Sequence, residues 1–165
     1  MAAPSFHLAE YNVAHLRAPL DAPEMEEFVA FLDPINAHAE RCPGFVWRLT
    51  APGGRPSSYL AGALANPMAV PNLSVWTDLG ALRAFAYDTV HRYFLQHRQR
   101  WFARTDEPHL VLWWVPAGHL PTLAEAEARL RLLESRGPTA DTFTFQEAFD
   151  PAGRPSPCGR DGAGA

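Results

Sequence analysis

The chain has 165 residues, a formal net charge of −4, and 47% hydrophobic against 19% charged residues. This length and composition predict one soluble globular domain that can bury a sizeable core. A weak net charge without a basic stripe argues against nucleic acid as a partner. No stretch approaches the roughly 20 apolar residues of a membrane span. All 14 positively charged residues are arginines, which is typical of a GC-rich genome such as that of an actinobacterium.

The two cysteines, Cys42 and Cys158, are too few and too isolated for a disulfide framework or a zinc site. We therefore expect free thiols and no metal site. The first residues lack a basic start followed by an apolar segment, so the sequence predicts no secretory signal. A cytoplasmic location follows from these features.

Hydrophobic periodicity divides most of the chain into strands and helices. One helix start is marked clearly, because Thr122 is a favourable N-cap and Glu125 stands at the capping-box position. In chain order, we predict a strand at 6–16, a helix that opens at 21–23 and stops at 42–44, strands at 45–49 and 73–76, a long helix at 79–102, a strand at 109–115, a helix at 122–136 and a possible edge strand at 143–149.

Two segments lack such periodicity. Residues 51–71 are rich in Gly, Pro and Ala, and a loop of this length is typically a lid, a binding loop or disordered. Residues 151–165 are rich in Gly and Pro, and we predict a disordered tail. A single domain over residues 1–150 is therefore expected.

The order β-α-β-β-α-β, followed by a helix, is that of the ferredoxin-like split βαβ arrangement. We therefore predict an α+β fold with helices on one face of the sheet. The second face also needs a cover, because strand 109–115 is apolar on both sides and tryptophans are frequent on the strands. Sheet-to-sheet packing in a homodimer is the simplest cover. The tryptophans on predicted strands are Trp47, Trp76, Trp113 and Trp114.

The predicted helix at 79–102 carries a histidine in its apolar stripe. At about 100° per residue, His97 falls on the same face as Phe94 and Trp101. Two interpretations stay open. His97 is either a hydrogen-bonded core or pocket-lining residue, or it is a general acid or base, since an imidazole titrates near neutral pH.

Polar residues on the strands are further candidates. Glu10 and Asn12 share a strand face, and either line a site beneath the helices or form hydrogen bonds across a dimer interface. Arg48 either anchors an anionic substrate or forms an ion pair. The sequence has no P-loop, dinucleotide fingerprint, nucleophile elbow or HExxH motif. Phosphate transfer, nicotinamide chemistry on a Rossmann unit and triad hydrolysis are therefore disfavoured.

Several stretches together form a specific pattern: LAEYNVAHLRAPLDAPEMEEFVAFLDPINAHAE, PGFVWRLT, NLSVWTDLGALRAFAY and DEPHLVLWWVPAGHLPTLAEAEARL. Over about Phe6 to Phe145, the chain resembles an uncharacterised bacterial family of the dimeric α/β-barrel superfamily, which is antibiotic-biosynthesis-monooxygenase-like. The resemblance implies a barrel formed by two copies, with a pocket between helices and sheet into which His97 would point. The superfamily includes cofactor-independent monooxygenases of polyketide-type aromatics, haem-degrading monooxygenases, isomerases and proteins that only bind ligands.

The haem-degrading branch suggests one alternative. It uses an Asn on the first strand, a Trp on the second helix and a haem-ligating His later on that helix. Asn12, Tyr87 and His97 stand at comparable places in this sequence, with Tyr in place of Trp. An imidazole is suited to axial ligation of iron, so this resemblance implies haem as a possible cofactor, with His97 as its ligand.

These observations predict a small-molecule enzyme of specialised metabolism that acts on an apolar or aromatic substrate. The reaction is a monooxygenase-like oxygenation or a proton-transfer isomerisation or cyclisation, and no cofactor is expected. The alternative is a haem-binding protein or a non-catalytic protein that binds a hydrophobic ligand. The predicted catalytic residues are His97, Tyr87 and Asn12, and the predicted substrate-binding residues are Glu10, Trp76, Phe94, Trp101, Trp114 and Arg48.

Overall fold

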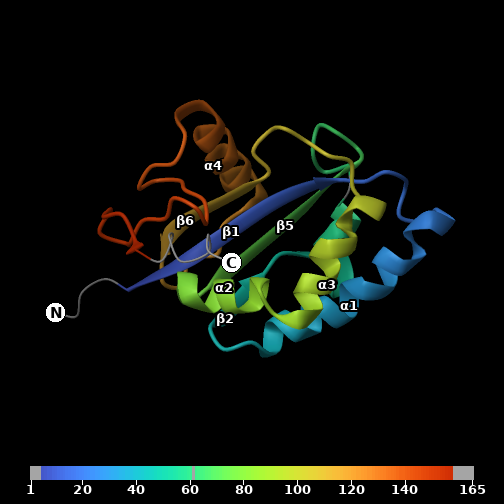
Figure 1. Cartoon of the computed structure of the whole chain (residues 1–165), viewed down its shortest axis with the longest axis horizontal. Helices are drawn as coiled ribbons and strands as arrows, with labels where there is room; N and C mark the ends of the chain where they lie inside the picture. The colour runs from blue at the N-terminus through green and yellow to red at the C-terminus, as the bar shows by residue number, and fades with distance from the viewer. Residues whose placement is uncertain (1–4, 61, 158–165) are drawn as a thin grey trace.

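A four-stranded antiparallel sheet forms the centre of the protein in a computed structural model, which describes residues 5–60 and 62–157 (Figure 1). Its strand order is β2-β5-β1-β6, with helices in the connections that follow β1 and β5. This arrangement confirms the predicted α+β, ferredoxin-like class. Barrel formation by two copies stays a prediction. The strands are β1 (Phe6–His15), β2 (Phe45–Arg48), β5 (Ala69–Trp76) and β6 (Leu110–Pro116).

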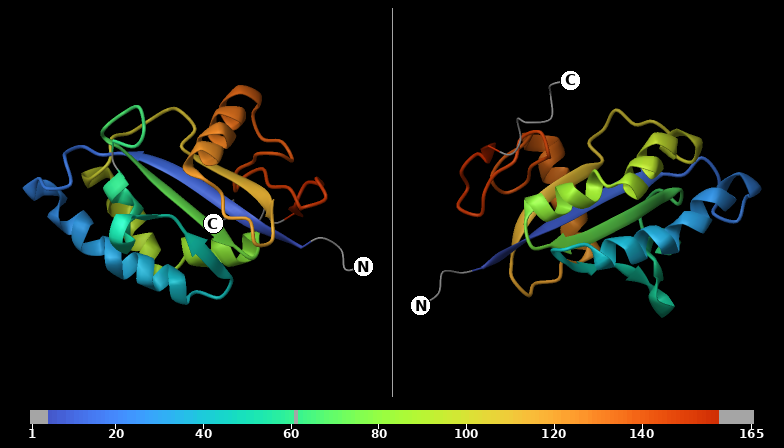
Figure 2. Two further views of the ribbon diagram at one scale, coloured as in Figure 1. Left: turned by 180° about the vertical axis from the view of Figure 1, so that it is seen from behind. Right: turned by 60° about the horizontal axis from the view of Figure 1, so that its bottom comes forward.

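Three helices cover one face of this sheet, opposite α4 (Figure 2). They are α1 (Glu26–Arg41), which follows the 3-10 turn η1 (Pro23–Met25), and the pair α2 (Leu79–Ala86) and α3 (Thr89–His97). Their apolar residues, including Phe28, Leu32 and Leu82, pack toward the sheet and are buried.

The long helix predicted at 79–102 is wrong. The chain leaves the α2 axis after Ala86, and Asp88 starts a new helix, because its backbone oxygen accepts the N–H of Arg92 (2.7 Å). Asp is a favourable N-cap residue, so the break has a local cause in the sequence. A second change follows after α3, where the chain tightens into the 3-10 turn η4 (Arg98–Arg100).

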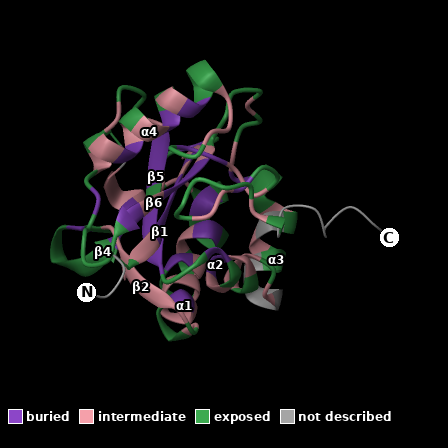
Figure 3. Ribbon diagram, turned by 90° about the vertical axis from the view of Figure 1, so that its left-hand side faces the viewer, coloured by how far each residue is buried: buried purple, intermediate pink, exposed green. Residues whose placement is uncertain are grey.

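Helix α4 (Leu123–Arg136) covers the other face of the sheet, as the position of the buried strands between the helix layers shows (Figure 3). Leu130 and Leu133 of α4 are buried in one cluster with Tyr11 and Trp113. Over β1 and β6, α4 itself covers this face of the sheet. A second copy is therefore not needed to cover that part. A homodimer stays an untested prediction.

The N-cap of α4 provides a direct test of local stability. The Thr122 hydroxyl accepts the N–H of Glu125 (3.2 Å), as the capping box predicted. Thr122→Ala should lower the free energy of unfolding by about 1 kcal/mol, measured by urea denaturation. Ser135→Ala, near the other end of the same helix, is the control and should cost less than about 0.5 kcal/mol. Equal losses in the two variants would contradict the capping role.

Residues 51–60 and 62–71 are more ordered than the composition of this stretch suggested. The strands β3 (Thr50–Ala51) and β4 (Arg55–Pro56) pair around the turn η2 (Pro52–Gly54), and the turn η3 (Ser57–Leu60) follows. Gly53 and Gly54 both have positive φ angles (77° and 75°), which a glycine adopts without strain. This hairpin brings Ser57, which is buried, to the edge of the space between α1 and the sheet.

The C-terminal segment packs against β6 without forming the predicted edge strand at 143–149. Phe143 and Leu112 exchange two backbone hydrogen bonds (2.9 Å each), and the pairing ends there. Trp114 packs on the same segment and donates its Nε1–H to the Phe149 carbonyl oxygen (2.8 Å). The segment thus covers the apolar side chains at this edge of the sheet.

Residues 151–157, which we predicted to be disordered, form a turn. The Ser156 N–H donates to the Ala148 carbonyl oxygen (2.8 Å), which returns the chain to the folded segment. The rest of the predicted tail, 158–165 with Cys158, lies outside the described residues. Across 5–60 and 62–157, no helix is long and apolar enough to cross a membrane.

Candidate functional site

A cavity of about 440 Å³ lies between the sheet and the helices α1, α2 and α3. This volume is in the range of sites for small organic ligands. Most of its wall is apolar and much of it is aromatic, and a few polar side chains reach it from the strands. The residues that supply the aromatic wall are Phe28, Phe45, Trp76, Phe85, Phe94, Phe102 and Phe145.

Strand alternation sends the polar side chains into this cavity. On β1, Glu10 and Asn12 face the helices α1 to α3, whereas Tyr11 between them faces α4. The pairing register aligns Glu10 with Ser74 on β5, and Ser74 in turn with Arg48 on β2. Glu10, Ser74 and Arg48 therefore form one row across three adjacent strands, at the base of the cavity.

Glu10 is the buried acid of the site, with 5% of its surface exposed. Its Oε1 accepts a hydrogen bond from Nδ2 of Asn12 (2.5 Å), and its Oε2 accepts one from the Ser74 hydroxyl (3.0 Å). Burial raises the pKa of Glu10 from 4.5 to about 7, although the hydrogen bonds from Asn12 and Ser74 lower it in part. A carboxyl group in this state exchanges a proton near neutral pH.

Trp76 orients the hydroxyl group in this network. Its indole Nε1–H donates to the Ser74 hydroxyl oxygen (3.0 Å), so that oxygen acts as an acceptor on one side. The single O–H of Ser74 is then directed to Glu10. Trp76 therefore donates to Ser74, and Ser74 donates to Glu10. The hydrogen bond that Glu10 accepts stabilises its ionised carboxylate.

Arg48 is a partly buried cation of the site. Its Nε donates to Oε1 of Glu40 (2.7 Å), and 17% of its side chain is exposed. Its Nη1 is buried and has no hydrogen-bond acceptor among the described residues. The sequence left an ion pair and an anion anchor open for Arg48. The geometry shows the ion pair with Glu40 and leaves the buried Nη1 amino group of the guanidinium without an acceptor.

At its other end the cavity is lined by exposed polar residues, which mark where it meets solvent. These side chains come from η4 and the loop that follows it, and from the ends of β1 and β6. They include Arg98, Gln99, Arg104 and His109.

The structure brings five of the nine predicted site residues to the cavity and leaves four outside its wall. Those on the wall are Glu10, Asn12, Arg48, Trp76 and Phe94. Those outside it are His97, Tyr87, Trp101 and Trp114.

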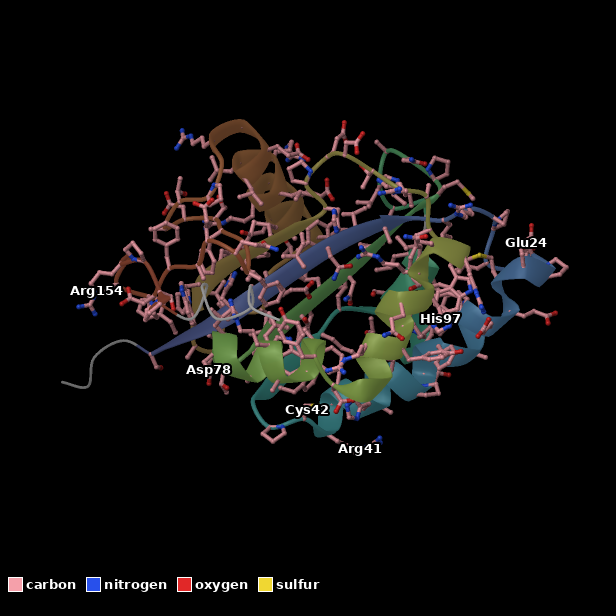
Figure 4. The ribbon with its side chains drawn as sticks, in the orientation of Figure 1. Glu24, Arg41, Cys42, Asp78, His97 and Arg154 are labelled. Atoms are coloured by element: carbon pink, nitrogen blue, oxygen red, sulfur yellow. The ribbon has the colours of Figure 1, made fainter. Side chains whose placement is uncertain are left out.

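The expected position of His97 in the pocket is wrong. Its Nδ1 donates to the carbonyl oxygen of Tyr93 (2.8 Å), and its ring lies on the Tyr93 ring with centroids 4.1 Å apart. Figure 4 shows His97 on α3, beside α1. The projection that placed it in the pocket assumed one helix, and the break at Asp88 changes the phase of every later residue.

The other three predicted site residues outside the cavity wall lie elsewhere in the fold. Tyr87 is 63% exposed at the end of α2. Trp101 is buried against Phe28, with ring centroids 5.7 Å apart, and Trp114 packs on the C-terminal segment. Because the haem alternative relied on His97 in the pocket, it loses its predicted axial ligand there. Among the described residues, no three His, Cys, Asp or Glu side chains are grouped to hold a metal ion.

Ser74 is a site residue that the sequence analysis missed. It had a signal in the sequence, because Asn72, Ser74 and Trp76 alternate with the apolar Leu73 and Val75. This alternation marks a polar strip on one face of β5. The alternation alone does not show that this strip is part of a site. The register of the strands does, because it places Ser74 beside Glu10.

Comparison with solved structures finds similar chains of low sequence identity. SnoaB, a cofactor-independent oxygenase from Streptomyces nogalater, is 19% identical with a TM-score of 0.44, over 74% of this chain and 100% of that one. PA3566 from Pseudomonas aeruginosa is 11% identical with a TM-score of 0.46, over 73% of this chain and 100% of that one. SO0527 from Shewanella oneidensis is 9% identical with a TM-score of 0.43, over 68% and 91%. Similarity at this level carries no information about activity.

No curated protein matches the chain in sequence. One family does, and its match extends from β1 past α4 to the end of the described C-terminal segment. Like the family that the sequence pattern resembled, it has no assigned activity. Since the match spans residues 7–158, the chain belongs to the family described as Domain of unknown function (DUF3291).

Proposed function

We propose that this protein is a small-molecule enzyme in which the Glu10 carboxylate takes a proton from an apolar or aromatic substrate. The main support is a buried carboxyl group on the cavity wall with a pKa of about 7, which suits proton transfer near neutral pH. We assign this role to Glu10 in place of His97, because Glu10 lines the cavity and His97 does not.

In this proposal Asn12 and Ser74 orient the carboxylate toward the substrate. Each donates to a different oxygen of Glu10, so the carboxyl plane cannot rotate freely. The Asn12 amide has a second N–H, which we assign to the oxyanion that develops when a proton next to a carbonyl group is removed. The aromatic wall holds the substrate and limits the access of water to the reacting carbon.

Removal of the proton produces a carbanion or enolate, and three reactions start from it. Return of the proton at another atom is an isomerisation, and attack on a second group of the same molecule is a cyclisation. Reaction of the carbanion with dioxygen gives a substrate hydroperoxide, which loses water and leaves one oxygen atom in the substrate as a carbonyl. This monooxygenase-like oxygenation takes its electrons from the substrate and needs no bound cofactor. Removal of a proton by the buried Glu10 is the first step of all three reactions.

Hydrogen–deuterium exchange of a weak carbon acid tests the proposal. The probe is 2-tetralone in D₂O, with loss of its α-proton signal followed by NMR. The wild-type protein should speed the exchange above the buffer rate, and Glu10→Gln should not. Glu24→Gln removes an exposed carboxylate of the turn η1 and should behave as wild type. Wild-type exchange at the buffer rate, or equal exchange by Glu10→Gln, would contradict the proposal. Binding of the probe without exchange would favour the non-catalytic alternative.

A further inference from the structure

We infer that Arg48 binds a negatively charged group of the ligand, and that the cavity therefore takes apolar or aromatic molecules with one carboxylate. This inference names a substrate class for the proposed function and so rests on it, but it concerns binding and not proton transfer. Three observations carry it: the buried Nη1 amino group of Arg48 has no acceptor, Arg48 stands in one row with Ser74 and Glu10, and the wall of the cavity is mostly apolar.

The first observation is the state of the guanidinium. Glu40 occupies only the Nε of Arg48 (2.7 Å), and that carboxylate is itself 46% exposed. Solvent weakens an ion pair of this kind, so much of the positive charge is left for another partner. The buried Nη1 without an acceptor is costly, and a ligand oxygen placed there would remove this cost.

The second observation is the separation of the two charged groups in the cavity. Arg48 and Glu10 stand on either side of Ser74, with two strand spacings of about 4.8 Å between their strands. Glu10 accepts its hydrogen bonds from Asn12 and Ser74, and Arg48 pairs with Glu40. A ligand can therefore place an anion at Arg48 and an acidic proton at Glu10 at the same time.

The third observation limits the ligand to one negative charge. Most of the wall is apolar, and Arg48 is the arginine of the wall that is not exposed to solvent. An ionised Glu10 in the same cavity repels a dianion. Arg98 and Arg104 also line the cavity, but both are exposed, and their charges are screened by solvent. A carboxylate on an apolar body fits these conditions, and a dianionic phosphate monoester does not.

A pair of probes of equal shape tests this inference by titration calorimetry at pH 8. The probes are 2-naphthoate, which carries a carboxylate, and the neutral 2-naphthamide. The wild-type protein should bind the naphthoate roughly tenfold or more tightly, as expected for a hydrogen bond to a charged group. Arg48→Gln should abolish this preference and leave the affinity for naphthamide within about twofold.

Three further variants separate this role from a structural one. Glu40→Gln removes the competing carboxylate, so the naphthoate should bind more tightly than it does to wild type. Arg100→Gln breaks another Arg–Glu pair, with Glu27 (3.4 Å), outside the cavity wall and should leave both affinities unchanged. Arg104→Gln removes an exposed cation of the cavity wall and should change the preference by less than twofold.

Equal binding of the two probes to wild type, binding of neither, or an unchanged preference in Arg48→Gln would overturn the inference. The proposed function fails in a different way. Glu10→Gln should still prefer naphthoate, since the variant keeps Arg48. A wild-type protein that does not catalyse the exchange but still prefers naphthoate would contradict the proposed proton transfer and support the anion site at Arg48.

Discussion

The rate of 2-tetralone exchange catalysed by the wild-type protein should rise about tenfold per pH unit below pH 7 and level off above it. The reason is that only ionised Glu10 acts as a base, and burial raises the pKa of this group to about 7. At pH 8, Glu10→Gln should lower the catalysed rate at least about a hundredfold, the usual contribution of a positioned general base. Exchange followed by NMR over a series of pH values measures both effects.

Ser74→Ala is the companion variant for this pH profile. It removes a hydrogen bond that lowers the pKa of Glu10, so the midpoint of the profile should move to higher pH. Glu24→Gln should keep the wild-type midpoint, since Glu24 is exposed on η1. A midpoint near pH 4.5, or one that Ser74→Ala leaves in place, would show that Glu10 is not the titrating base.

Stability should respond to the same group, in the opposite direction to activity. The pKa of Glu10 is about 7 in the folded protein, against 4.5 for an ordinary glutamate, so the folded state holds the proton more tightly. The stabilisation from this buried neutral carboxyl is complete below pH 4.5 and is lost as the pH rises through 7. Between pH 5 and pH 8, the free energy of unfolding of wild type should fall by about 2 to 3 kcal/mol on account of Glu10.

Urea denaturation at pH 5 and pH 8 measures this loss, and Glu10→Gln isolates it. A buried glutamine does not ionise, so the variant should lack the part of the pH dependence that belongs to Glu10. At pH 8 it should therefore be at least as stable as wild type. The same fall in both proteins would contradict the raised pKa, and would also remove the main support for the proposed base.

The alternation of β1 in the sequence predicted that Glu10 and Asn12 share one face, and the structure confirms it. A strand has a period of two whatever packs on it, so this prediction needs no tertiary information. The choice between a site and a dimer interface was left open, because it depends on which side the helices pack. In the structure α1 to α3 lie over this face and α4 over the other.

The predicted position of His97 in the pocket was wrong because an angular error persists for every later residue of a projected helix. A projection from Leu79 is reliable only while the axis continues, and here the axis ends at Ala86. Asp88, an N-cap residue, carried the signal for the break, but the apolar stripe across it suggested continuity. Tyr87, which the resemblance to the haem-degrading branch suggested for the site, is exposed at that break.

The sequence by itself determined the order of the four strands of the main sheet, the ferredoxin-like class and the family, since these depend on local periodicity and on similarity along the chain. Only the tertiary structure decided which residue is the candidate base. Burial raises the pKa of Glu10, and a hydrogen bond from Ser74, which is 64 positions further along the chain, lowers it in part. The helix periodicity that singled out His97 contains no such contact, because burial and register arise only when the sheet and its helices pack together.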